Sequence, residues 1–351
     1  MENQGAGAAS KEEILKAAQR LADGELVAFP TETVYGLGGD ASNEQAIRKI
    51  YEAKGRPADH PVIVHVADPQ QARLWVRDLP PEAMRLMSAF WPGPLTMVLK
   101  KADWVSPMVS GGQDSVGIRC PSHPVAQQLL QAFADLRKGD PAGVAAPSAN
   151  RFGRVSPTLS EHVRDEFADL VTNGMPVLEG GATEVGIEST IVDLSRIYEG
   201  QAPVLLRPGH ILPADIESVL GVSLVLRDVN APRVSGSLKA HYSPSTPMRL
   251  IKPQELLEKV RQWCRNNPGK RLAVVRQSHT KSVALPVEVE IDQVVWRSMS
   301  DNHHYYAQSL YAQLREIDKL KVDAVFWEDV PDGVTWDGIR DRLHRAAAAF
   351  D

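Results

Sequence analysis

The sequence predicts a two-domain α/β protein, with a mixed β-sheet in the first domain and a smaller parallel sheet in the second. The chain has 351 residues, which is long enough for two hydrophobic cores. Up to about residue 222, short apolar runs typical of strands alternate irregularly with segments of helical periodicity, as in a domain with a mixed sheet. Beyond residue 246 strands and helices alternate regularly, as in a parallel βα unit.

Helix and strand signals place the elements of the first domain, expected over residues 11–222. A helix over residues 11–22 has apolar side chains at helical spacing, and the helix over residues 43–55 ends at Gly55 because Pro57 blocks its continuation. The other predicted helices are 81–93, 124–134 and 159–168. The predicted strands are 26–29, 61–66, 95–100, 115–120, 142–149, 188–194 and 203–209. The glycine-rich residues 36–39 could bend anywhere and are not assigned to a strand.

Residues 223–246 form the predicted linker, because this Ser- and Pro-containing stretch lacks hydrophobic periodicity. A structureless run of roughly 20 residues is usually a linker or a functional loop. We expect it to lie as a lid across a cavity in the first domain. The domain that follows, residues 247–351, is predicted to be a Rossmann-like α/β unit. Its predicted helices are 253–266, 305–320 and 336–350, and its predicted strands are 271–277 and 322–330.

Composition and charge exclude several classes of protein. The chain is 43% hydrophobic and 24% charged, as in ordinary globular proteins, and no apolar run approaches the roughly 20 residues of a membrane span. A net charge of −5 argues against non-specific nucleic-acid binding, although a local basic cleft remains compatible with it. Cys120 and Cys264 are far apart in sequence, so we expect neither disulfides nor a Cys-x-x-Cys zinc site. The expected location is cytoplasmic, and residues 1–10 read as a mobile tail rather than a secretory signal.

Polar side chains cluster where the elements of the first domain end. Ligands of open α/β sheets gather at strand ends, so we expect these clusters to converge on one cleft. Arginine and lysine side chains there could hold a polyanion, and the hydroxyl and amide groups could orient a small polar ligand. The residues are Thr33, Lys54, Arg56, His65, Arg119, Ser148, Asn150, Ser189 and Arg207.

Each cluster also has a structural interpretation. Lys54 and Arg56 could complement a helix dipole, His65 could be a satisfied core histidine, and Arg119 could form a structural ion pair. Ser and Asn residues often form turns. A zinc site is disfavoured, because no third ligand follows the two histidines near residues 60–65 at a usual spacing.

Familiar catalytic motifs are missing from the sequence. It has no P-loop, no Gly-x-Gly-x-x-Gly turn between a strand and a helix, no Gly-x-Ser-x-Gly elbow and no Cys-x-x-Cys pair. The residues alone therefore indicate a cleft for an anion and a small ligand, in which the anion is a nucleotide.

Seven ordered motifs resemble one family. They are "FPTETVYGLGGDA", "KGRPADHPVIVHV", "FWPGPLTMVL", "VGIRCPSHPVA", "AAPSANRFGRVSPT", "GIESTIVDL" and "LLRPG". Together, over roughly residues 12–215, they resemble the YrdC-type threonylcarbamoyl-AMP synthase family. The linker "SGSLKAHYSP" and the following α/β domain are similar to the long two-domain form of that family.

The resemblance implies a nucleotidyltransferase of tRNA modification with a concave, positively charged cavity. It would condense L-threonine, bicarbonate or CO2, and ATP into threonylcarbamoyl-AMP and pyrophosphate. Other proteins would then transfer the threonylcarbamoyl group to adenosine 37 of ANN-decoding tRNAs. The implied partners are the three substrates and a downstream transferase complex, with a possible direct tRNA contact and no membrane. Mg²⁺ would accompany ATP, with no metal held by the protein itself.

The family's site residues can be carried over position by position. The implied threonine site comprises Thr33, His65, Arg119, Ala146 through its backbone, and Ser189. The implied nucleotide site comprises Lys54, Arg56, His60, Ser115, Ser148, Asn150, Ser156, Arg207, His241 and Tyr242. No residue is expected to act as a covalent nucleophile, which agrees with the missing Ser–His and Cys–His signatures.

Two departures from the family pattern stand out. His60 occupies a position that is usually Asn, and the linker lacks a Gly-Met and a further basic residue before His241. Glu32 keeps two interpretations, a structural acid or a neighbour of the basic cluster, while Tyr35 is expected to line or support the cavity floor.

Two other functions compete with the synthase. A non-catalytic RNA-binding protein could use the same basic cavity, but aromatic residues make up only 6% of the chain and the net charge is negative. A carbamoyltransferase acting on carbamoyl phosphate would need acylphosphatase-like and zinc-finger segments, which the sequence lacks.

Overall fold

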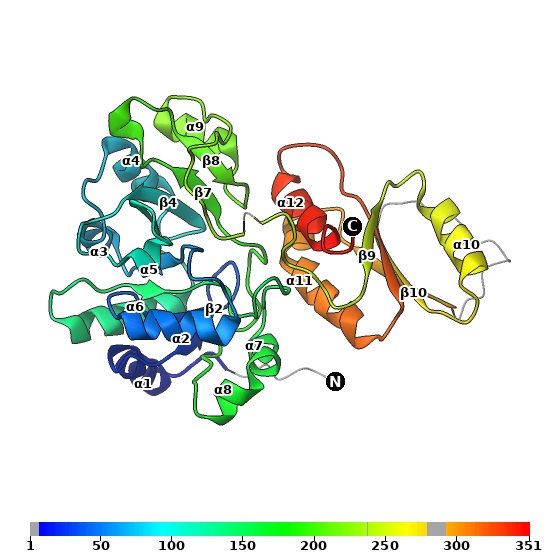
Figure 1. Cartoon of the computed structure of the whole chain (residues 1–351), viewed down its shortest axis with the longest axis horizontal. Helices are drawn as coiled ribbons and strands as arrows, with labels where there is room; N and C mark the ends of the chain where they lie inside the picture. Colours follow the sequence, from blue (N-terminus) through cyan, green and yellow to red (C-terminus); the bar gives the residue numbers. More distant parts are fainter. Residues whose placement is uncertain (1–6, 237, 279–292) are drawn as a thin grey trace. The chain divides into compact units, whose positions relative to one another are not determined.

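The computed structural model describes residues 7–236, 238–278 and 293–351 (Figure 1). The chain forms two compact units, one of residues 1–152 and 156–237 and the other of residues 153–155 and 238–351. The units divide inside the segment 223–246 that the sequence predicts as a linker. Most of the predicted N-terminal tail, residues 1–6, lies outside the described residues.

The N-terminal unit is built on an eight-stranded sheet of order β1-β2-β6-β3-β5-β4-β7-β8. Neighbours β3 and β5 are parallel, as are β4 and β7, and the other pairs are antiparallel, so the predicted mixed sheet is confirmed. The strands are β1 (Val27–Phe29), β2 (Gly36–Asp40), β3 (Ile63–His65), β4 (Leu95–Lys100), β5 (Ser115–Arg119), β6 (Val144–Ala145), β7 (Thr190–Asp193) and β8 (Val204–Arg207).

Strand β2 is the one that the sequence does not predict in this sheet, because its glycines resemble a turn. All five of its residues are buried, and it pairs with β1 on one side and β6 on the other. A Cβ atom on Gly38 would lie 2.7 Å from Cγ1 of Val144 and 2.8 Å from Cε1 of Phe29. The glycines therefore allow close packing around a central strand rather than a bend.

The helices of the N-terminal unit begin and end at local signals. Ser10 and Glu13 form a capping box at the start of α1, and Gly55 ends α2 in the left-handed conformation with φ of 62°. The five helices predicted here are confirmed as α1 (Lys11–Ala22), α2 (Glu44–Lys54), α4 (Pro81–Phe90), α6 (Pro124–Arg137) and α7 (Ser160–Glu166). Shorter helices that the sequence analysis does not assign are α3 (Pro69–Leu74), α5 (Pro107–Ser110), α8 (Ala168–Thr172) and α9 (Pro213–Leu220).

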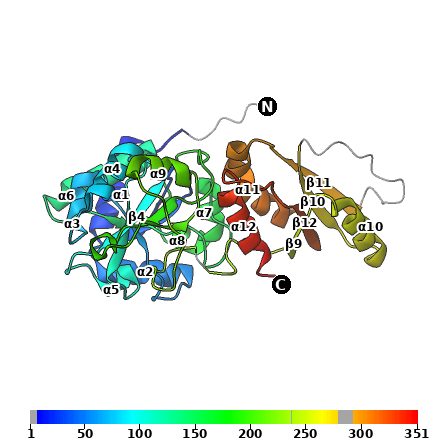
Figure 2. The ribbon, with the colours of Figure 1, turned by 90° about the horizontal axis from the view of Figure 1, so that it is seen from above.

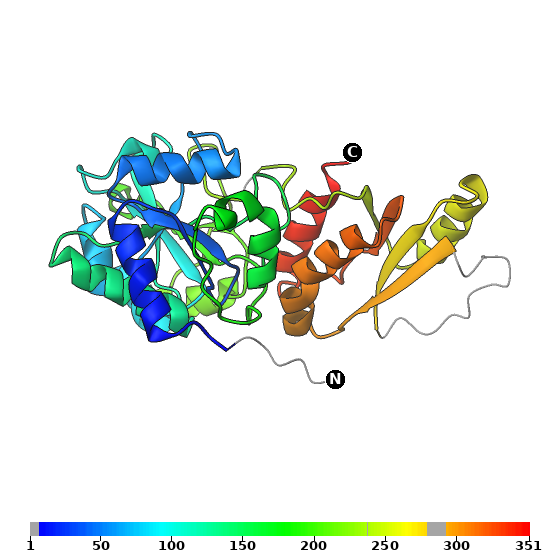
Figure 3. The ribbon, with the colours of Figure 1, turned by 90° about the horizontal axis from the view of Figure 1, so that it is seen from below.

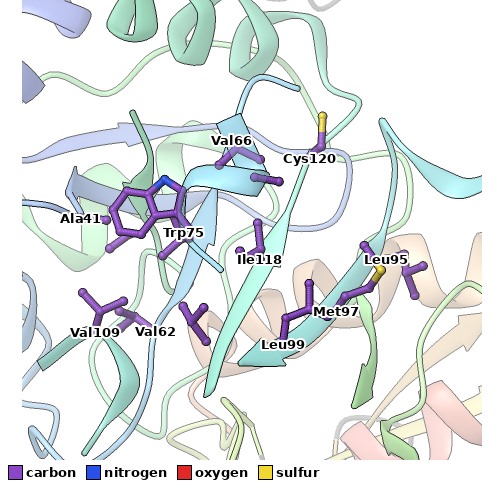
Figure 4. Close-up of a cluster of buried hydrophobic side chains, with 14 of the residues drawn as sticks. Ala41, Val62, Val66, Trp75, Leu95, Met97, Leu99, Val109, Ile118 and Cys120 are labelled. Carbon is purple, nitrogen blue, oxygen red and sulfur yellow. The ribbon is translucent and has the colours of Figure 1, made fainter. Parts of the chain in front are cut away.

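Apolar side chains fill both faces of the eight-stranded sheet. One cluster, drawn in Figure 4, surrounds the fully buried Trp75 and includes Leu95, Met97 and Ile118 from the central strands. The other lies under α1 and α6, the dark blue and teal helices that lie side by side in Figure 3. Because both faces are covered, polar side chains reach solvent or a ligand mainly at the strand ends.

The C-terminal unit has a four-stranded, fully parallel sheet of order β11-β10-β12-β9. Figure 2 shows α10 on one side of this sheet and α11 and α12 on the other. The predicted parallel α/β arrangement is confirmed, but in chain order the strands run 3-2-4-1 rather than the 3-2-1-4 of a dinucleotide-binding sheet. The elements are β9 (Met248–Ile251), α10 (Leu256–Asn266), β10 (Leu272–Gln277), β11 (Val294–Met299), α11 (His303–Lys319), β12 (Ala324–Glu328) and α12 (Asp337–Ala347).

No helix in residues 7–236, 238–278 or 293–351 is long and apolar enough to cross a membrane. Cys120 and Cys264 are both buried free thiols, as expected from their separation in sequence. Burial is the main factor that raises the pKa of Cys120, to about 11, so its thiol stays protonated and inert at neutral pH.

Candidate functional site

The loop between β1 and β2 forms the first part of the site. Its backbone turns at Thr31, whose hydroxyl donates to the carbonyl of Val34 at 2.6 Å. The turn directs Glu32 and Thr33 into the interior, where they are 2% and 0% exposed. The hydroxyl of Tyr35, at the end of the loop, donates to the carbonyl of Gly181 at 2.8 Å, and its expected place at the cavity floor stays a prediction.

Arg119, at the end of β5, meets this loop. One of its terminal nitrogens donates to Oγ1 of Thr33 at 2.8 Å, and the other lies 2.6 Å from Oε1 of Glu32. The two charged side chains are 5% and 3% exposed, so this is a buried ion pair. Glu32 is thus the counter-ion of Arg119, which answers the question that its position in the sequence leaves open.

His65 lies beside Arg119 on the neighbouring parallel strand β3, where the two residues face each other in register. Burial, and then the charge of Arg119, lower the pKa of His65 to about 3. The imidazole is therefore neutral at physiological pH. Its Nδ1 is buried and has no hydrogen-bond partner among the residues that the structure describes, so it can take part in ligand binding.

Ser189 and Arg207 form a second cluster on the other side of β4. The guanidinium of Arg207 donates to the carbonyl of Ser189 at 2.9 and 3.1 Å and to its hydroxyl at 3.1 Å. The Ser189 hydroxyl also hydrogen-bonds the hydroxyl of Thr96 at 2.7 Å. Because Met97 pairs with Ile118, continuing the antiparallel register places Thr96 opposite Arg119 and so connects the two clusters.

The segment 233–235, which we call the cover segment, lies over the second cluster. Its Ser235 carbonyl accepts from Arg207 at 2.9 Å, and its Ser235 hydroxyl accepts from Arg56 at 3.4 Å. The side-chain oxygen of Gln113 accepts the backbone N–H of Arg233 at 2.6 Å, and the side-chain nitrogen of Gln113 donates to the backbone carbonyl of Arg233 at 3.1 Å. Residues of the predicted linker therefore contact two of the predicted nucleotide-binding cations.

A narrow cavity of about 20 Å³ lies beneath the cover segment. This volume is close to the space that one water molecule needs. A nucleotide therefore cannot enter the cavity while the cover segment lies over it. Ser115 is 2% exposed, and among the described residues its hydroxyl has no hydrogen-bond partner. The cavity is lined by Pro61, Val62, Ile63, Thr96, Val98, Gln113, Ser115, Gly117, Ile191, Arg233, Val234 and Ser235.

The side chain of Lys54 is directed at backbone carbonyls and not at a site for a phosphate group. Its ammonium group donates to the carbonyl of Ser148 at 2.5 Å and to the carbonyl of Asn150, and its side chain is buried. Burial, followed by the charge of Arg56, lowers the pKa of Lys54 well below its usual value. In this conformation Lys54 holds the loop that carries Ser148 and Asn150.

The remaining predicted residues of the N-terminal unit have partners of their own. Ser156 donates to Glu188 at 2.6 Å, and the backbone amide of Ala146 donates to the carbonyl of Ile63 at 3.1 Å. The ring of His60 packs edge-on against Phe152, with ring centroids 5.4 Å apart. Burial, then the charge of Arg56, lowers the pKa of His60.

His241 and Tyr242, the two linker residues predicted to contact the nucleotide, belong to the C-terminal unit. Tyr242 is 1% exposed and packs against Tyr311 and beneath the guanidinium of Arg342. His241 stacks edge-on against Tyr242, with ring centroids 4.1 Å apart. Their assignment to the nucleotide site stays a prediction.

Sequence reasoning misses several members of the two clusters. Thr31 and Thr96 are ordinary strand or turn residues in the sequence, and nothing in their spacing marks them. Glu188 is part of the site only because it contacts Ser156, and Ser235 only because it contacts Arg56 and Arg207. Both are tertiary contacts that the sequence does not reveal. Among the described residues, no group of three or more His, Cys, Asp or Glu side chains could hold a metal ion.

Comparisons with protein families match nearly the whole chain. The family described as "Telomere recombination" matches residues 19–209. The family described as "Threonylcarbamoyl-AMP synthase, C-terminal domain" matches residues 211–348.

Individual relatives agree over the same extent. The chain is 38% identical to the threonylcarbamoyl-AMP synthase of Bacillus subtilis over 342 residues, covering 95% of this chain and 93% of the relative. It is 34% identical to the synthase of Pyrococcus abyssi over 345 residues, covering 94% and 93%. A crystal structure of P. abyssi Sua5 complexed with L-threonine superposes with a TM-score of 0.82 at 34% identity, covering 97% of this chain and 95% of the other.

Proposed function

The chain belongs to the threonylcarbamoyl-AMP synthase family over nearly its whole length, and on that premise we propose how its residues divide the reaction between them. The enzyme makes threonylcarbamoyl-AMP, the activated intermediate of tRNA threonylcarbamoylation. L-Threonine, bicarbonate or CO2, and ATP are condensed, and pyrophosphate leaves. Transfer of the threonylcarbamoyl group to adenosine 37 of tRNA belongs to a separate transferase.

The cluster of Arg119, Thr33 and His65 forms the threonine end of the site in this proposal. Arg119 binds the substrate carboxylate, since a guanidinium matches a carboxylate in charge and geometry. Neutral His65 offers its Nδ1 to a donor of the substrate. Ser189 and the backbone near Ala146 close this end. The threonine named in the related P. abyssi structure supports the choice of ligand.

The nucleotide end comprises Arg56 and Arg207, with Ser115 as a buried hydroxyl in the cavity beneath the cover segment. Both arginines contact Ser235 of the cover segment, and this contact must open before phosphates can reach them. We assign the cover segment as part of a lid for this reason. His60, Ser148, Asn150 and Ser156 complete the part of the proposed nucleotide site that lies in the N-terminal unit.

Lys54 supports the nucleotide end indirectly, through the carbonyls of Ser148 and Asn150. Mg²⁺ arrives with ATP and neutralises part of the phosphate charge, largely through water and phosphate oxygens. The finer assignment of a positively charged cavity rests on Arg56, Arg119 and Arg207, which are 7%, 4% and 4% exposed.

The reaction needs positioning and charge neutralisation more than a protein nucleophile. The threonine amine adds to CO2 and forms a carbamate. A carbamate oxygen then attacks the α-phosphorus of ATP in line, and the bond to the leaving pyrophosphate breaks. Arg56 and Arg207 stabilise charge that develops on the phosphate oxygens. In this proposal Arg207 belongs to the nucleotide end and Ser189 to the threonine end. Their direct hydrogen bond supports two adjacent ends, as this attack requires.

The contact between Arg207 and Ser189 is the observation that carries the proposal, because it joins a residue of each end within hydrogen-bond distance. Binding of RNA alone fits the geometry less well, since the arginines are buried in an interior site rather than along an open groove.

Mass analysis of one reaction mixture tests the proposal. Full-length protein is incubated with ATP, L-threonine and ¹³C-bicarbonate, and the nucleotide products are separated rapidly. The expected product is threonylcarbamoyl-AMP with one ¹³C in its carbamoyl group. An AMP adduct that lacks the label, or that forms without threonine, contradicts the proposed reaction.

A further inference from the structure

Thr31 and Glu32 directly precede Thr33, and neither has a role in the site as proposed so far. Both are 2% exposed, so water does not satisfy their polar atoms. Burying a carboxylate and a hydroxyl is costly unless each is bonded or paired. The contacts that they make therefore indicate what they do.

Glu32 is fixed on three sides. Its Oε1 pairs with Arg119 at 2.6 Å, its Oε2 accepts the backbone N–H of Ser122 at 3.1 Å, and its carbonyl accepts the backbone N–H of Val185 at 2.8 Å. A guanidinium is planar and rigid, so holding one terminal nitrogen fixes the direction of the others. Glu32 thereby sets where Arg119 can present its remaining N–H groups.

Thr31 sets the direction of a hydrogen-bond chain. A carbonyl can only accept, so the 2.6 Å contact with Val34 uses the single hydroxyl hydrogen of Thr31. The 2.9 Å contact between Thr31 and Thr33 must then have Thr33 as its donor. Because Arg119 donates to Thr33 at 2.8 Å, Thr33 keeps one lone pair and no hydrogen for a ligand.

We propose that Thr31 and Glu32 are positioning residues of the threonine end, and that they determine which substrate group each of its two main contacts accepts. Glu32 holds Arg119 as the donor for the substrate carboxylate. Thr31 makes Thr33 a pure acceptor, which takes an N–H or O–H of the amino acid and repels its carboxylate. The inference rests on the threonine site proposed above, and it defines the orientation of the substrate within that site.

Five variants of the full-length protein test the inference: Glu32→Gln, Thr31→Val, Thr31→Ser, Arg119→Lys and Asp40→Asn. Asp40→Asn is the matched control, because Asp40 is also a buried carboxylate paired with an arginine, Arg137 at 3.1 Å, at the opposite end of β2. The readouts are the Kd of L-threonine by calorimetry and the KM of ATP.

Glu32→Gln should weaken threonine binding by about tenfold to hundredfold, the range for a hydrogen bond to a charged group, and change the ATP KM by less than about twofold. Thr31→Val should weaken threonine binding by about fivefold, because Thr33 loses its acceptor. Thr31→Ser restores the hydroxyl and should return the Kd to within about twofold of the original. Asp40→Asn should change neither constant.

The outcomes separate failure of the inference from failure of the proposed site. If Arg119→Lys weakens threonine binding while Glu32→Gln and Thr31→Val do not, the inference is overturned and the site stands. Normal threonine binding in Arg119→Lys overturns both. An equal loss of threonine and ATP affinity in Glu32→Gln, or the same loss in Asp40→Asn, shows a general structural effect and also overturns the inference. Should Glu32→Gln not fold, the valine and serine variants of Thr31 still decide the matter.

Discussion

Acid should destabilise the N-terminal unit through His65. Burial and the neighbouring Arg119 lower the pKa of this side chain from 6.5 to about 3. Below the ordinary pKa the unfolded chain takes up a proton at this position, while the folded chain does not until the pH approaches the lowered value. The unfolded state then binds more protons, so the free energy of unfolding falls as the pH falls through this window. Above the ordinary pKa the effect is absent.

The size of the effect follows from the shift. Between the lowered and the ordinary pKa, the free energy of unfolding changes by about 1.4 kcal/mol per pH unit for one proton. Lowering the pH over about two units below the ordinary histidine pKa should therefore remove roughly 2 to 3 kcal/mol of stability through His65 alone. His65→Asn has no titrating group, so it should lack this part of the pH dependence, whatever stability it loses at neutral pH.

Urea unfolding of both proteins, followed at several pH values between about 7.5 and 4.5, measures the difference. The variant is expected to start less stable, and the gap between the two proteins should shrink by about 2 kcal/mol as the pH falls. A gap that stays constant across this range would mean that folded His65 takes up its proton as easily as the unfolded chain. The lowered pKa of folded His65 would then be wrong.

Three further predictions concern the supports of the site. Lys54→Met should remove the Lys54 hydrogen bonds to the carbonyls of Ser148 and Asn150, lower the free energy of unfolding by roughly 2 kcal/mol in urea titrations and raise the ATP KM; unchanged values of both would contradict its supporting role. Thr96→Val should raise the threonine KM by about fivefold, because the hydroxyl of Ser189 loses one of its two partners, and Thr96→Ser should reverse this; a valine variant with normal kinetics would rule out a role for the contact. Gln113→Ala should speed ATP association in stopped-flow measurements by about tenfold, because the cover segment loses its two hydrogen bonds to Gln113 and opens more easily; an unchanged rate would argue against a lid.

The sequence predicts most elements of this fold because their periodicity and end signals are local. The helix over residues 11–22 is found with the same bounds, and the strand before Thr33 delivers this residue to the interior as expected. Strand β2 escapes prediction because its glycines serve packing against Val144 and Phe29, which are distant in sequence or on another strand. The strand order of the C-terminal unit is equally a tertiary property.

The site was predictable in its residue types but not in their partners. Chain order and strand ends predict that Thr33, Arg119 and Ser189 belong to one cleft. The structure joins Thr33 to Arg119 of β5, and Ser189 to Thr96 of the neighbouring strand β4, by hydrogen bonds. The sequence does not reveal that Lys54 faces backbone carbonyls, since that depends on where the loop after β6 passes. Charge alone suggests a phosphate ligand, whereas burial of the ammonium indicates a support.

The central claim is that one interior site holds the threonine carboxylate at Arg119 and the ATP phosphates at Arg207. The most direct test is the pair of KM values for threonine and ATP in Arg119→Lys and Arg207→Lys, from pyrophosphate release by the full-length enzyme. Arg119→Lys should raise the threonine KM by at least about tenfold with a much smaller change for ATP, and Arg207→Lys should do the reverse. Equal effects of both variants on both substrates would contradict the claim.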